Sequence, residues 1–500
     1  MNLSCLLSLL KEMPAYRRLV EQLLGTKGEQ RMLILDAAKP YFIATLYEEL
    51  NSPMMVITAQ PENARRLYEQ LQVWCPPSAN LHRFPELDFL PYEYLASYPT
   101  NTMLERLQAL STLALYKNGG EPLIVTSALA AITKTVAQGD FVAACHVLNQ
   151  GMTAEPLNLL HKWQGMGYEM EDIVELPGAM SRRGGIIDVF PPCSQLPARI
   201  EFFGNQIESI RCFDPESQKS IKSIGSITVT PAKEVAGGGS ILDYLDDKAL
   251  LILDVAEEIE AAVQRLHTQS QELRTIKLEH GELPQDFPPP YFTWEELEPT
   301  IRTRQRLVVK SWDITNSYEQ ALSFTPSQSY GGRLENFLKA ARQITGKGQR
   351  LLVVSHQANR LAELLQEEGI HISPASGIEE LPLPGSITVL QGSLAEGWAM
   401  DNKLNLITDA ELFGFVKQAR PSKKIPLRRQ WLLPQLTPGD YVVHVDHGIA
   451  RFNGLTRMSS NGIEREYLIL EYGGDDRLYV PTEQIERVSR YIGASDQPPP

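Results

Sequence analysis

The sequence predicts a protein of several domains, mainly of the α/β class. Its 500 residues exceed the roughly 100 to 200 residues of a typical single domain. A hydrophobic share of 43% with 22% charged residues is typical of globular chains. Short apolar runs alternate with helical patterns early in the chain, and strand patterns alone fill its last part. We therefore expect a parallel sheet first and a small β domain last.

The first domain is predicted from strand-like runs that are each followed by a helical pattern. Residues Arg31–Asp36, Pro53–Thr58 and Pro122–Thr126 are such runs, and Glu62–Val73 has helical periodicity. Parallel strands need crossover connections of this kind. From about Asp140 the pattern changes to one helix followed by alternating strands, which predicts an inserted α+β domain.

The remaining chain returns to α/β alternation and then becomes almost wholly β. Leu351–Ser355 reads as a strand and Gln357–Glu367 as the helix after it. Asp440–Ser489 contains short strands separated by glycines, which predicts a small barrel of the SH3/Tudor-like type. The stretch before it carries six basic residues and several prolines, which favours a solvated interdomain linker over a DNA-binding arm: Lys417, Arg420, Lys423, Lys424, Arg428 and Arg429.

Six segments follow from these patterns. The α/β domain is predicted in two parts, interrupted by the inserted domain, and is followed by a small α/β domain of unknown role, the basic linker and the terminal barrel. In that order of the chain the bounds are 1–137, 138–230, 231–325, 326–416, 417–434 and 435–495.

Charge, cysteine content and hydropathy exclude several classes of protein. A net charge of −14 gives no general attraction to nucleic acid, so any such contact must be local. The five cysteines are scattered without a C-x-x-C pair, which indicates neither a disulfide framework nor a zinc site. Apolar runs are far shorter than the roughly 20 residues of a membrane helix. We expect a cytoplasmic protein without a membrane partner.

A nucleotide site is expected where the first strand meets its helix, and here it is degenerate. The turn from Asp36 to Tyr41 has no glycine, Pro40 lacks an N–H, and no Ser or Thr follows Lys39. A phosphate cradle of the G-x-x-x-x-G-K-[ST] type cannot form from these residues.

The strand Leu250–Val255 ends in Asp254, the position of a metal-binding Asp in helicase-like folds. Val255 stands where a catalytic Glu would follow. Asp36, Lys39 and Asp254 are therefore predicted to form a degenerate nucleotide site, with no catalytic residue, metal or cofactor in this chain. The alternative is purely structural, because apolar strands that end in Asp are common.

Two histidines have a spacing that could bind a metal. His444 and His447 lie three residues apart in an alternating strand pattern. Because side chains alternate along a strand, we expect the two rings on opposite faces unless the chain bends at Gly448. A shared metal is not predicted.

Three stretches resemble the amino-terminal half of the bacterial transcription-repair coupling factors, the Mfd family. Residues 84–136 (FPELDFLPYEYLASYPTNTMLERLQAL, then LIVTSALAAI) also look like the first domain of UvrB. Residues 181–217 (SRRGGIIDVFPPCSQLPARIEFFGNQIESIRCFDPES) are similar to the UvrB domain that docks UvrA. Residues 436–491 (LTPGDYVVHVDHGIARFNG through YVPTEQIERVSRY) look like the polymerase-interacting domain shared with the CarD family.

The resemblance implies a fold, a motor elsewhere and two protein partners. The helicase-like, UvrB-like domain is implied to be a catalytically inactive copy. ATP and magnesium are implied only for a translocase motor that follows the polymerase-binding domain, through which DNA would mainly be bound. We expect that this chain is a fragment lacking that motor, and that Gln497–Pro500 begins an interdomain linker. UvrA and the RNA polymerase β subunit are the implied partners.

Individual residues can be assigned from the resemblance. The UvrA-binding surface is implied to include Arg183, Arg199 and Phe203. The alternative is that Arg199 balances Glu201 on its own strand and that Phe203 is a core residue. Polymerase contact is placed on five residues of an exposed edge or face: Leu455, Arg457, Met458, Glu466 and Leu468.

The function implied is that of an adaptor in transcription-coupled nucleotide excision repair, which binds stalled polymerase and recruits UvrA. One alternative is a CarD-like transcription regulator with no repair role, for which Arg183 and Arg199 would be idle. Another is an ATP-driven nucleic-acid enzyme, which the turn at Asp36 opposes.

Overall fold

A computed structural model describes most of the chain. The described residues are 1–25, 27–87, 101–116, 120–234, 237–311, 320–367, 369–414, 438–439, 441–444, 447–460, 463–472, 476–481 and 488–490. They divide into two compact units, Met1–Gln418 and Ala419–Pro500, and each is described by itself. The predicted basic linker, 417–434, lies outside the described residues.

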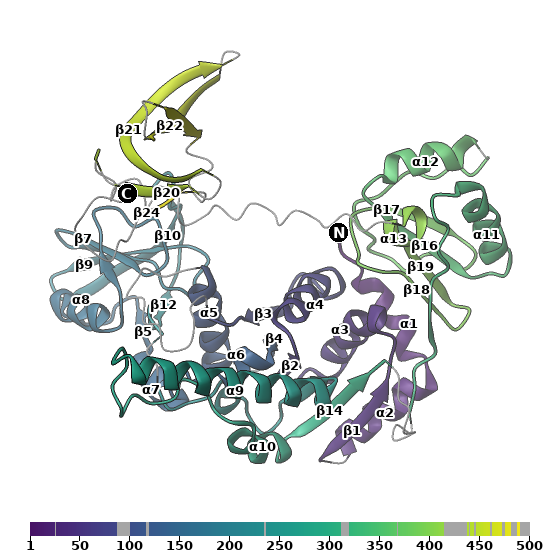
Figure 1. The fold of residues 1–500 in the computed structure, drawn as a ribbon, viewed down its shortest axis with the longest axis horizontal. Coiled ribbons are helices and arrows are strands. Elements are labelled where there is room, and N and C mark those ends of the chain that lie inside the picture. Colours follow the sequence, from purple (N-terminus) through teal and green to yellow (C-terminus); the bar gives the residue numbers. More distant parts are fainter. Residues whose placement is uncertain are drawn as a thin grey trace. The chain divides into compact units, whose positions relative to one another are not determined.

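The first unit is built on a six-stranded parallel sheet of order β1-β14-β13-β2-β4-β3. Four strands precede the inserted domain in sequence and two follow it (Figure 1). Their bounds are β1 Glu29–Leu33, β2 Met54–Thr58, β3 Asn80–Phe84, β4 Pro122–Ser127, β13 Leu250–Asp254 and β14 Gln305–Lys310. The predicted α/β class with a parallel sheet is confirmed.

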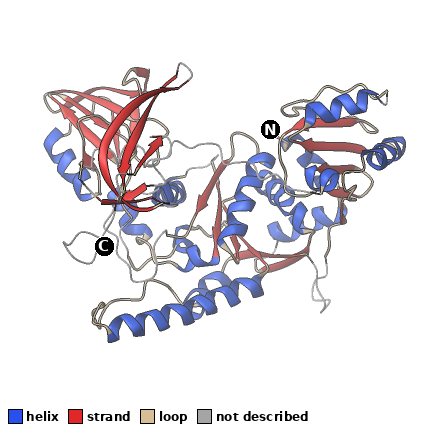
Figure 2. Cartoon of the chain, turned by 45° about the horizontal axis from the view of Figure 1, so that its top comes forward, coloured by secondary structure: helices blue, strands red, loops and turns tan. Residues whose placement is uncertain are grey.

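Helices cover both faces of this sheet, as Figure 2 shows in blue and red. One hydrophobic core joins the sheet to α2 (Pro14–Gly25), α3 (Lys39–Leu50) and α4 (Pro61–Trp74). A second core joins the other face to α5 (Asn101–Leu115), α6 (Ala128–Ile132), α9 (Ala256–Glu279) and α10 (Trp294–Arg302). The central strands are buried on both faces, which explains their uninterrupted apolar sequences.

The inserted domain contains a six-stranded, mostly antiparallel sheet of order β11-β10-β9-β8-β7-β6. A short β5–β12 pair and α8 (Pro156–Gly165) complete its core. The strands are β5 His146–Asn149, β6 Glu169–Met170, β7 Ala179–Arg183, β8 Ile186–Val189, β9 Ala198–Phe203, β10 Gln206–Phe213, β11 Ser220–Ser223 and β12 Ser226–Val229. The other face of this sheet carries only a smaller apolar cluster: Val174, Ala179, Phe190 and Phe213.

A third, mixed sheet of order β15-β18-β19-β16-β17 lies in residues 324–408. One of its faces packs on α11 (Leu334–Gly346) and α12 (Ala358–Glu367), and the other joins the first core. Trp398 of β18 (Trp398–Met400) lies 4.9 Å from Tyr41 and 5.9 Å from Trp74 between ring centroids. The remaining elements are β15 Phe324–Pro326, β16 Arg350–Ser355, β17 Ile387–Gln391, β19 Leu404–Thr408 and α13 Asp409–Phe413.

The second unit contains a five-stranded antiparallel sheet of order β23-β22-β21-β20-β24. Val442, Phe452, Leu468, Leu470 and Val480 form its core. Its strands are β20 Tyr441–His444, β21 Gly448–Ser460, β22 Ile463–Glu471, β23 Arg477–Pro481 and β24 Val488–Arg490. The sheet gives the unit a hydrophobic core of its own, while the SH3/Tudor-like barrel stays a prediction.

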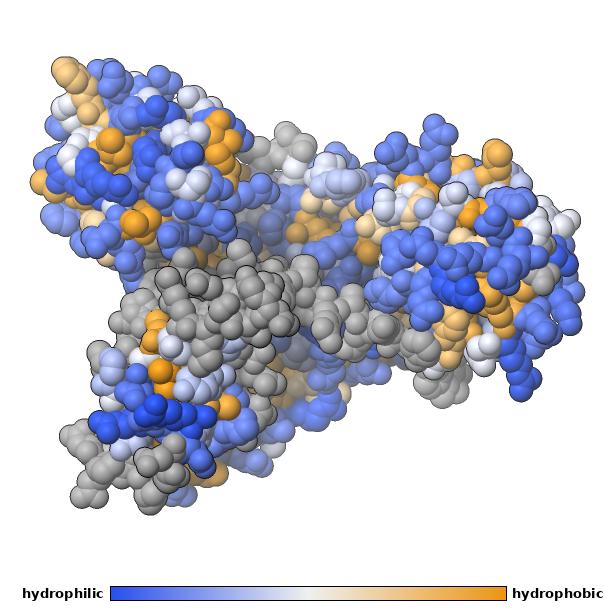
Figure 3. All heavy atoms as spheres, turned by 90° about the horizontal axis from the view of Figure 1, so that it is seen from above, coloured by the Kyte–Doolittle hydropathy of each residue, from blue (hydrophilic) through white to orange (hydrophobic). Residues whose placement is uncertain are grey.

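Within the described residues, no helix has the length and apolar character needed to cross a membrane. The face drawn in Figure 3 is largely hydrophilic, with apolar residues in small groups.

Candidate protein-binding surfaces and the degenerate nucleotide site

The predicted UvrA-binding residues lie on the face of the inserted sheet that is opposite its main core. Side chains alternate along its strands, so Ile187, Val189 and Ile200 enter the core while Asp188 and Arg199 point to the other face. Antiparallel pairing places Asp188 of β8 opposite Arg199 of β9. The charged residues of this face are therefore neighbours across strands.

Two hairpin turns meet at one end of this face. Gly184 between β7 and β8 has φ +61°, and Gly204 between β9 and β10 has φ +60°, values that favour glycine. The turns are adjacent, since the Phe202 N–H donates to the Gly185 carbonyl at 2.8 Å. They bring Arg183 and Phe203, which end β7 and β9, to the same end of the sheet.

Arg183 and Phe203 are both open to solvent. Phe203 is 79% exposed, and the side chain of Arg183 is 56% exposed. The alternative of a core role for Phe203 is wrong, because the hairpin carries its ring beyond the strands that could cover it. A large exposed ring beside an arginine is typical of a protein-binding surface.

Arg199 differs, because its guanidinium is held within the domain. Its Nε and Nη2 each donate to Asp188 carboxylate oxygens at 2.8 Å, and its side chain is 19% exposed. The alternative pairing with Glu201 is also wrong, since Glu201 pairs with Arg211 and accepts from Ser209. Asp188, which the sequence reasoning did not single out, could have been found as an acid within an apolar strand.

The predicted polymerase-binding residues lie on β21 and β22. The register pairs Leu455 with Leu468 and Arg457 with Glu466. Met458, the next residue of β21, pairs with the residue that precedes Glu466 on β22. Leu455 is 44% exposed, whereas Leu468 is wholly buried. The side chains of Arg457, Met458 and Glu466 lie outside those described. Leu468 belongs to the core and offers no side-chain contact, so we remove it from the predicted surface.

The two histidines follow the exception that the prediction allowed, a bend at Gly448. The rings of His444 and His447 lie 4.8 Å apart between centroids rather than on opposite faces. β20 ends at His444, which pairs with Gly448, and Gly448 has φ +76°. Strict alternation therefore no longer applies at His447, which follows the end of β20. Within the part of the chain that is described, no three His, Cys, Asp or Glu residues gather as a metal would need.

The three residues predicted to form a degenerate nucleotide site do come together. Lys39 Nζ lies 2.5 Å from an Asp254 carboxylate oxygen and 2.5 Å from one of Asp36. Lys39 begins α3 after a single 3₁₀ turn, Asp36–Ala38, and its side chain is 8% exposed. Its ammonium group is thus neutralised within the chain, where a nucleotide-binding lysine would be available to phosphate.

Burial and neighbouring charges have opposite effects on the pKa values of Lys39 and Asp254. Burial alone would lower the pKa of Lys39, but Asp254 and Asp36 raise it above its ordinary value. Burial raises the pKa of Asp254, and Lys39 offsets part of that rise. Val255, which follows, has φ +58°, a rare backbone conformation for a β-branched residue.

We expect this chain to hydrolyse no ATP above background, with or without DNA. Lys39 is already paired with two carboxylates, and the turn lacks the glycine N–H groups that hold phosphates. Phosphate release by the purified chain, measured beside Lys39→Ala, tests this. Turnover that DNA stimulates and that Lys39→Ala abolishes would contradict it.

Comparisons with known proteins match two segments of the chain to known domain families. Residues 147–235 match the UvrB interaction domain, and residues 436–492 match the CarD-like/TRCF RID domain. The chain is 27% identical to the transcription-repair-coupling factor of Bacillus subtilis over 98% of its own length and 47% of that protein. It is 25% identical to that of Staphylococcus aureus over 99% of its length and 48% of that protein.

The chain thus spans about half the length of the curated relatives it matches. The two matched domains occur in the order that the quoted stretches require. The predicted resemblance to the transcription-repair-coupling factors is confirmed along nearly the whole chain.

Proposed function

We propose that this chain is the adaptor part of a transcription-coupled nucleotide excision repair factor. It binds the RNA polymerase β subunit through the second unit and recruits UvrA through the inserted domain. The ATP-dependent motor, and with it most DNA contact, belongs to a longer protein. The observation that carries this proposal is that exposed Phe203 and exposed Arg183 lie at the same end of one sheet, in a segment that matches the UvrB interaction domain.

The structure offers a reason to favour this role over the two alternatives. A CarD-like regulator without a repair role has no use for an aromatic ring that is 79% exposed at the end of another domain, where exposure to water carries a cost. An ATP-driven enzyme needs a free lysine at the nucleotide site, and Lys39 is ion-paired.

Binding to UvrA tests the proposal directly. We expect Arg183→Ala and Phe203→Ala each to weaken UvrA binding by about 1 to 3 kcal/mol, the range of interface hot spots. Arg182→Ala is the matched control, because Arg182 is a neighbouring exposed arginine whose Nε donates back to the Gly184 carbonyl. Calorimetry with purified UvrA gives the affinities. Unchanged affinity in folded Arg183→Ala and Phe203→Ala variants would refute the surface.

The second unit should bind polymerase by itself, because it has its own hydrophobic core. We expect residues 419–500 to retain polymerase β subunit in a pull-down. Leu455→Glu should reduce retention about tenfold if this side chain is buried at the interface. Ile449→Glu is the control, since Ile449 is a similarly exposed residue of the same strand. Retention by the full chain but not by 419–500 would place the binding site elsewhere.

A further inference from the structure

We propose that Asp188 is a positioning residue of the UvrA-binding face: it fixes Arg199 in place and leaves Arg183 free for a carboxylate of the partner. This inference rests on the proposed function. The resemblance treats Arg183 and Arg199 alike, whereas this inference gives them different roles: Arg199 is held by Asp188, and Arg183 is available to the partner.

Asp188 is a buried carboxylate with a single strong partner. It is 3% exposed and accepts both of its close hydrogen bonds from Arg199. Ser181, which lies opposite it on β7, donates instead to the Asp172 carbonyl at 3.2 Å. A carboxylate so buried requires a cation beside it, and Arg199 is that cation.

Arg199 is in turn fixed on several sides. Its Nη1 donates to the Gln218 carbonyl at 3.3 Å, and its guanidinium lies 4.6 Å from the ring centroid of Phe213. Gln218 is itself held, with its amide donating to the Val174 and Pro215 carbonyls. The guanidinium can therefore present only its remaining edge to a partner, in one orientation.

Arg183 forms only a long ion pair with the same carboxylate. Its Nη2 is 4.0 Å from Asp188, and it makes only a long contact of 3.4 Å with the Asp172 carbonyl. Asp188 thus pairs closely with Arg199 and only weakly with Arg183, and Glu201 pairs with Arg211. The loosely held positive charge of Arg183 is left at the end of the sheet that carries exposed Phe203. This arrangement fits a partner surface with a carboxylate next to an apolar pocket.

Asp188→Asn distinguishes positioning from a simple charge effect by the sign of the change. The substitution removes a negative charge and keeps the side-chain volume. If only the summed charge of the face matters, an acidic partner should bind the variant more tightly. If Asp188 holds Arg199 in orientation, binding should weaken, because the freed guanidinium must be ordered again at the interface.

The experiment is a double-mutant cycle with purified UvrA, read by calorimetry, with a melting curve for every variant. We expect Asp188→Asn to weaken binding roughly 5- to 30-fold, a range typical of coupled neighbours. Glu201→Gln, the same charge change on the same face, should alter affinity less than about threefold. In the Arg199→Ala background, Asp188→Asn should cause no further loss of affinity. It should raise the melting temperature of that background, because it removes an unpaired buried charge.

The possible failures are separable. If the unaltered chain does not bind UvrA, the proposed function fails and this inference fails with it. If the chain binds but Asp188→Asn binds as tightly or more tightly, the inference alone is overturned. The inference is also overturned if the losses of UvrA affinity from Asp188→Asn and Arg199→Ala multiply in the double variant. The same holds if Glu201→Gln weakens binding as much as Asp188→Asn does.

Discussion

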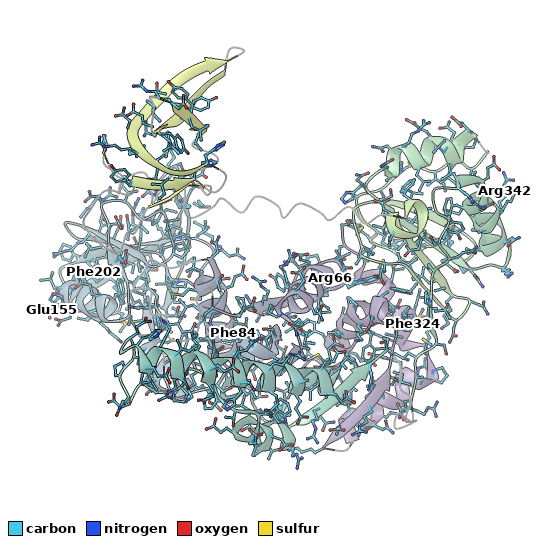
Figure 4. The ribbon with its side chains drawn as sticks, viewed as in Figure 1. Arg66, Phe84, Glu155, Phe202, Phe324 and Arg342 are labelled. Atoms are coloured by element: carbon cyan, nitrogen blue, oxygen red, sulfur yellow. The ribbon has the colours of Figure 1, made fainter. Side chains whose placement is uncertain are left out.

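Replacing Arg106 with alanine should destabilise the first unit by about 3 to 5 kcal/mol, the cost of breaking a buried ion pair from one side. Arg106 of α5 is wholly buried and forms two hydrogen bonds of 2.7 Å to Glu234. It also donates to the Pro85 carbonyl and lies 3.9 Å over the ring of Phe84, which Figure 4 labels. Alanine would leave the Glu234 carboxylate buried without its cation.

The pKa of Glu234 shows what the pair contributes. Burial acts to raise this pKa, but Arg106 and the Thr135 hydroxyl lower it below its ordinary value. A carboxylate with a lowered folded-state pKa stabilises the fold above its unfolded-state pKa and loses that contribution as pH falls through the folded-state value. We therefore expect the native protein to keep the contribution at pH 7, where the variant lacks it.

Urea denaturation at pH 7 measures the loss. Arg65→Ala is the control, because Arg65 pairs with Glu62 and Glu69 on an exposed helix face, and such pairs contribute about 0 to 1 kcal/mol. If Arg106→Ala costs no more than Arg65→Ala, Glu234 has found another partner or water. That outcome would mean that the Arg106–Glu234 pair does not stabilise the fold.

The position of this pair also matters for the inserted domain. Thr135 and Gly239 exchange two backbone hydrogen bonds, 2.8 and 3.1 Å long, so the chain segments that enter and leave the domain are joined at its base. Glu234 lies on the outgoing segment and bonds to Thr135 on the incoming one at 2.7 Å. Arg106 thus ties both connections to α5.

The sequence predicted what depends on local pattern and missed what depends on distant partners. Apolar runs located four of the six parallel strands, because strands buried on both faces have no polar alternation. The strands β3 and β14 were not predicted, since polar residues interrupt both. Arg106 was not singled out, since an arginine in a helix is normally a surface residue and its partner lies 128 residues away. Arg199 was weighed against Glu201 two residues along, whereas a cross-strand neighbour, Asp188, is its partner.

The residues of the candidate sites divide in the same way, into those that the sequence could predict and those that depend on the surrounding structure. Asp36, Lys39 and Asp254 could be grouped because the fold class fixes where a nucleotide site would lie. Among the polymerase-binding residues, Leu468 could not be told from Leu455, because the two are paired across the strands and so share one face of the sheet. Only the packing around each leaves Leu468 buried and Leu455 exposed. The place of His447 depends on the bend at Gly448, since a turn ends the alternation.

Replacing Lys39 with alanine should cost about 2 to 4 kcal/mol of stability at neutral pH. The substitution removes the cation that faces Asp254, whose side chain is 19% exposed. The pKa of Asp254 is already raised by burial and should rise further. Asp36→Ala is the control, because Asp36 is 67% exposed and its contact with Lys39 should be worth little.

The pH dependence of this loss identifies its cause. An acid whose folded-state pKa is raised disfavours the fold while it is ionised, and the penalty disappears as pH falls through that pKa. The deficit of Lys39→Ala against the native chain should therefore be greater at pH 7.5 than at pH 5, because lower pH favours the protonated Asp254 of the variant. In the native chain Lys39 has a raised pKa and stays charged across this range. Urea denaturation at both pH values measures the difference, and a deficit that does not change with pH would mean that lost packing of the lysine stem, rather than the unpaired carboxylate, destabilises the variant.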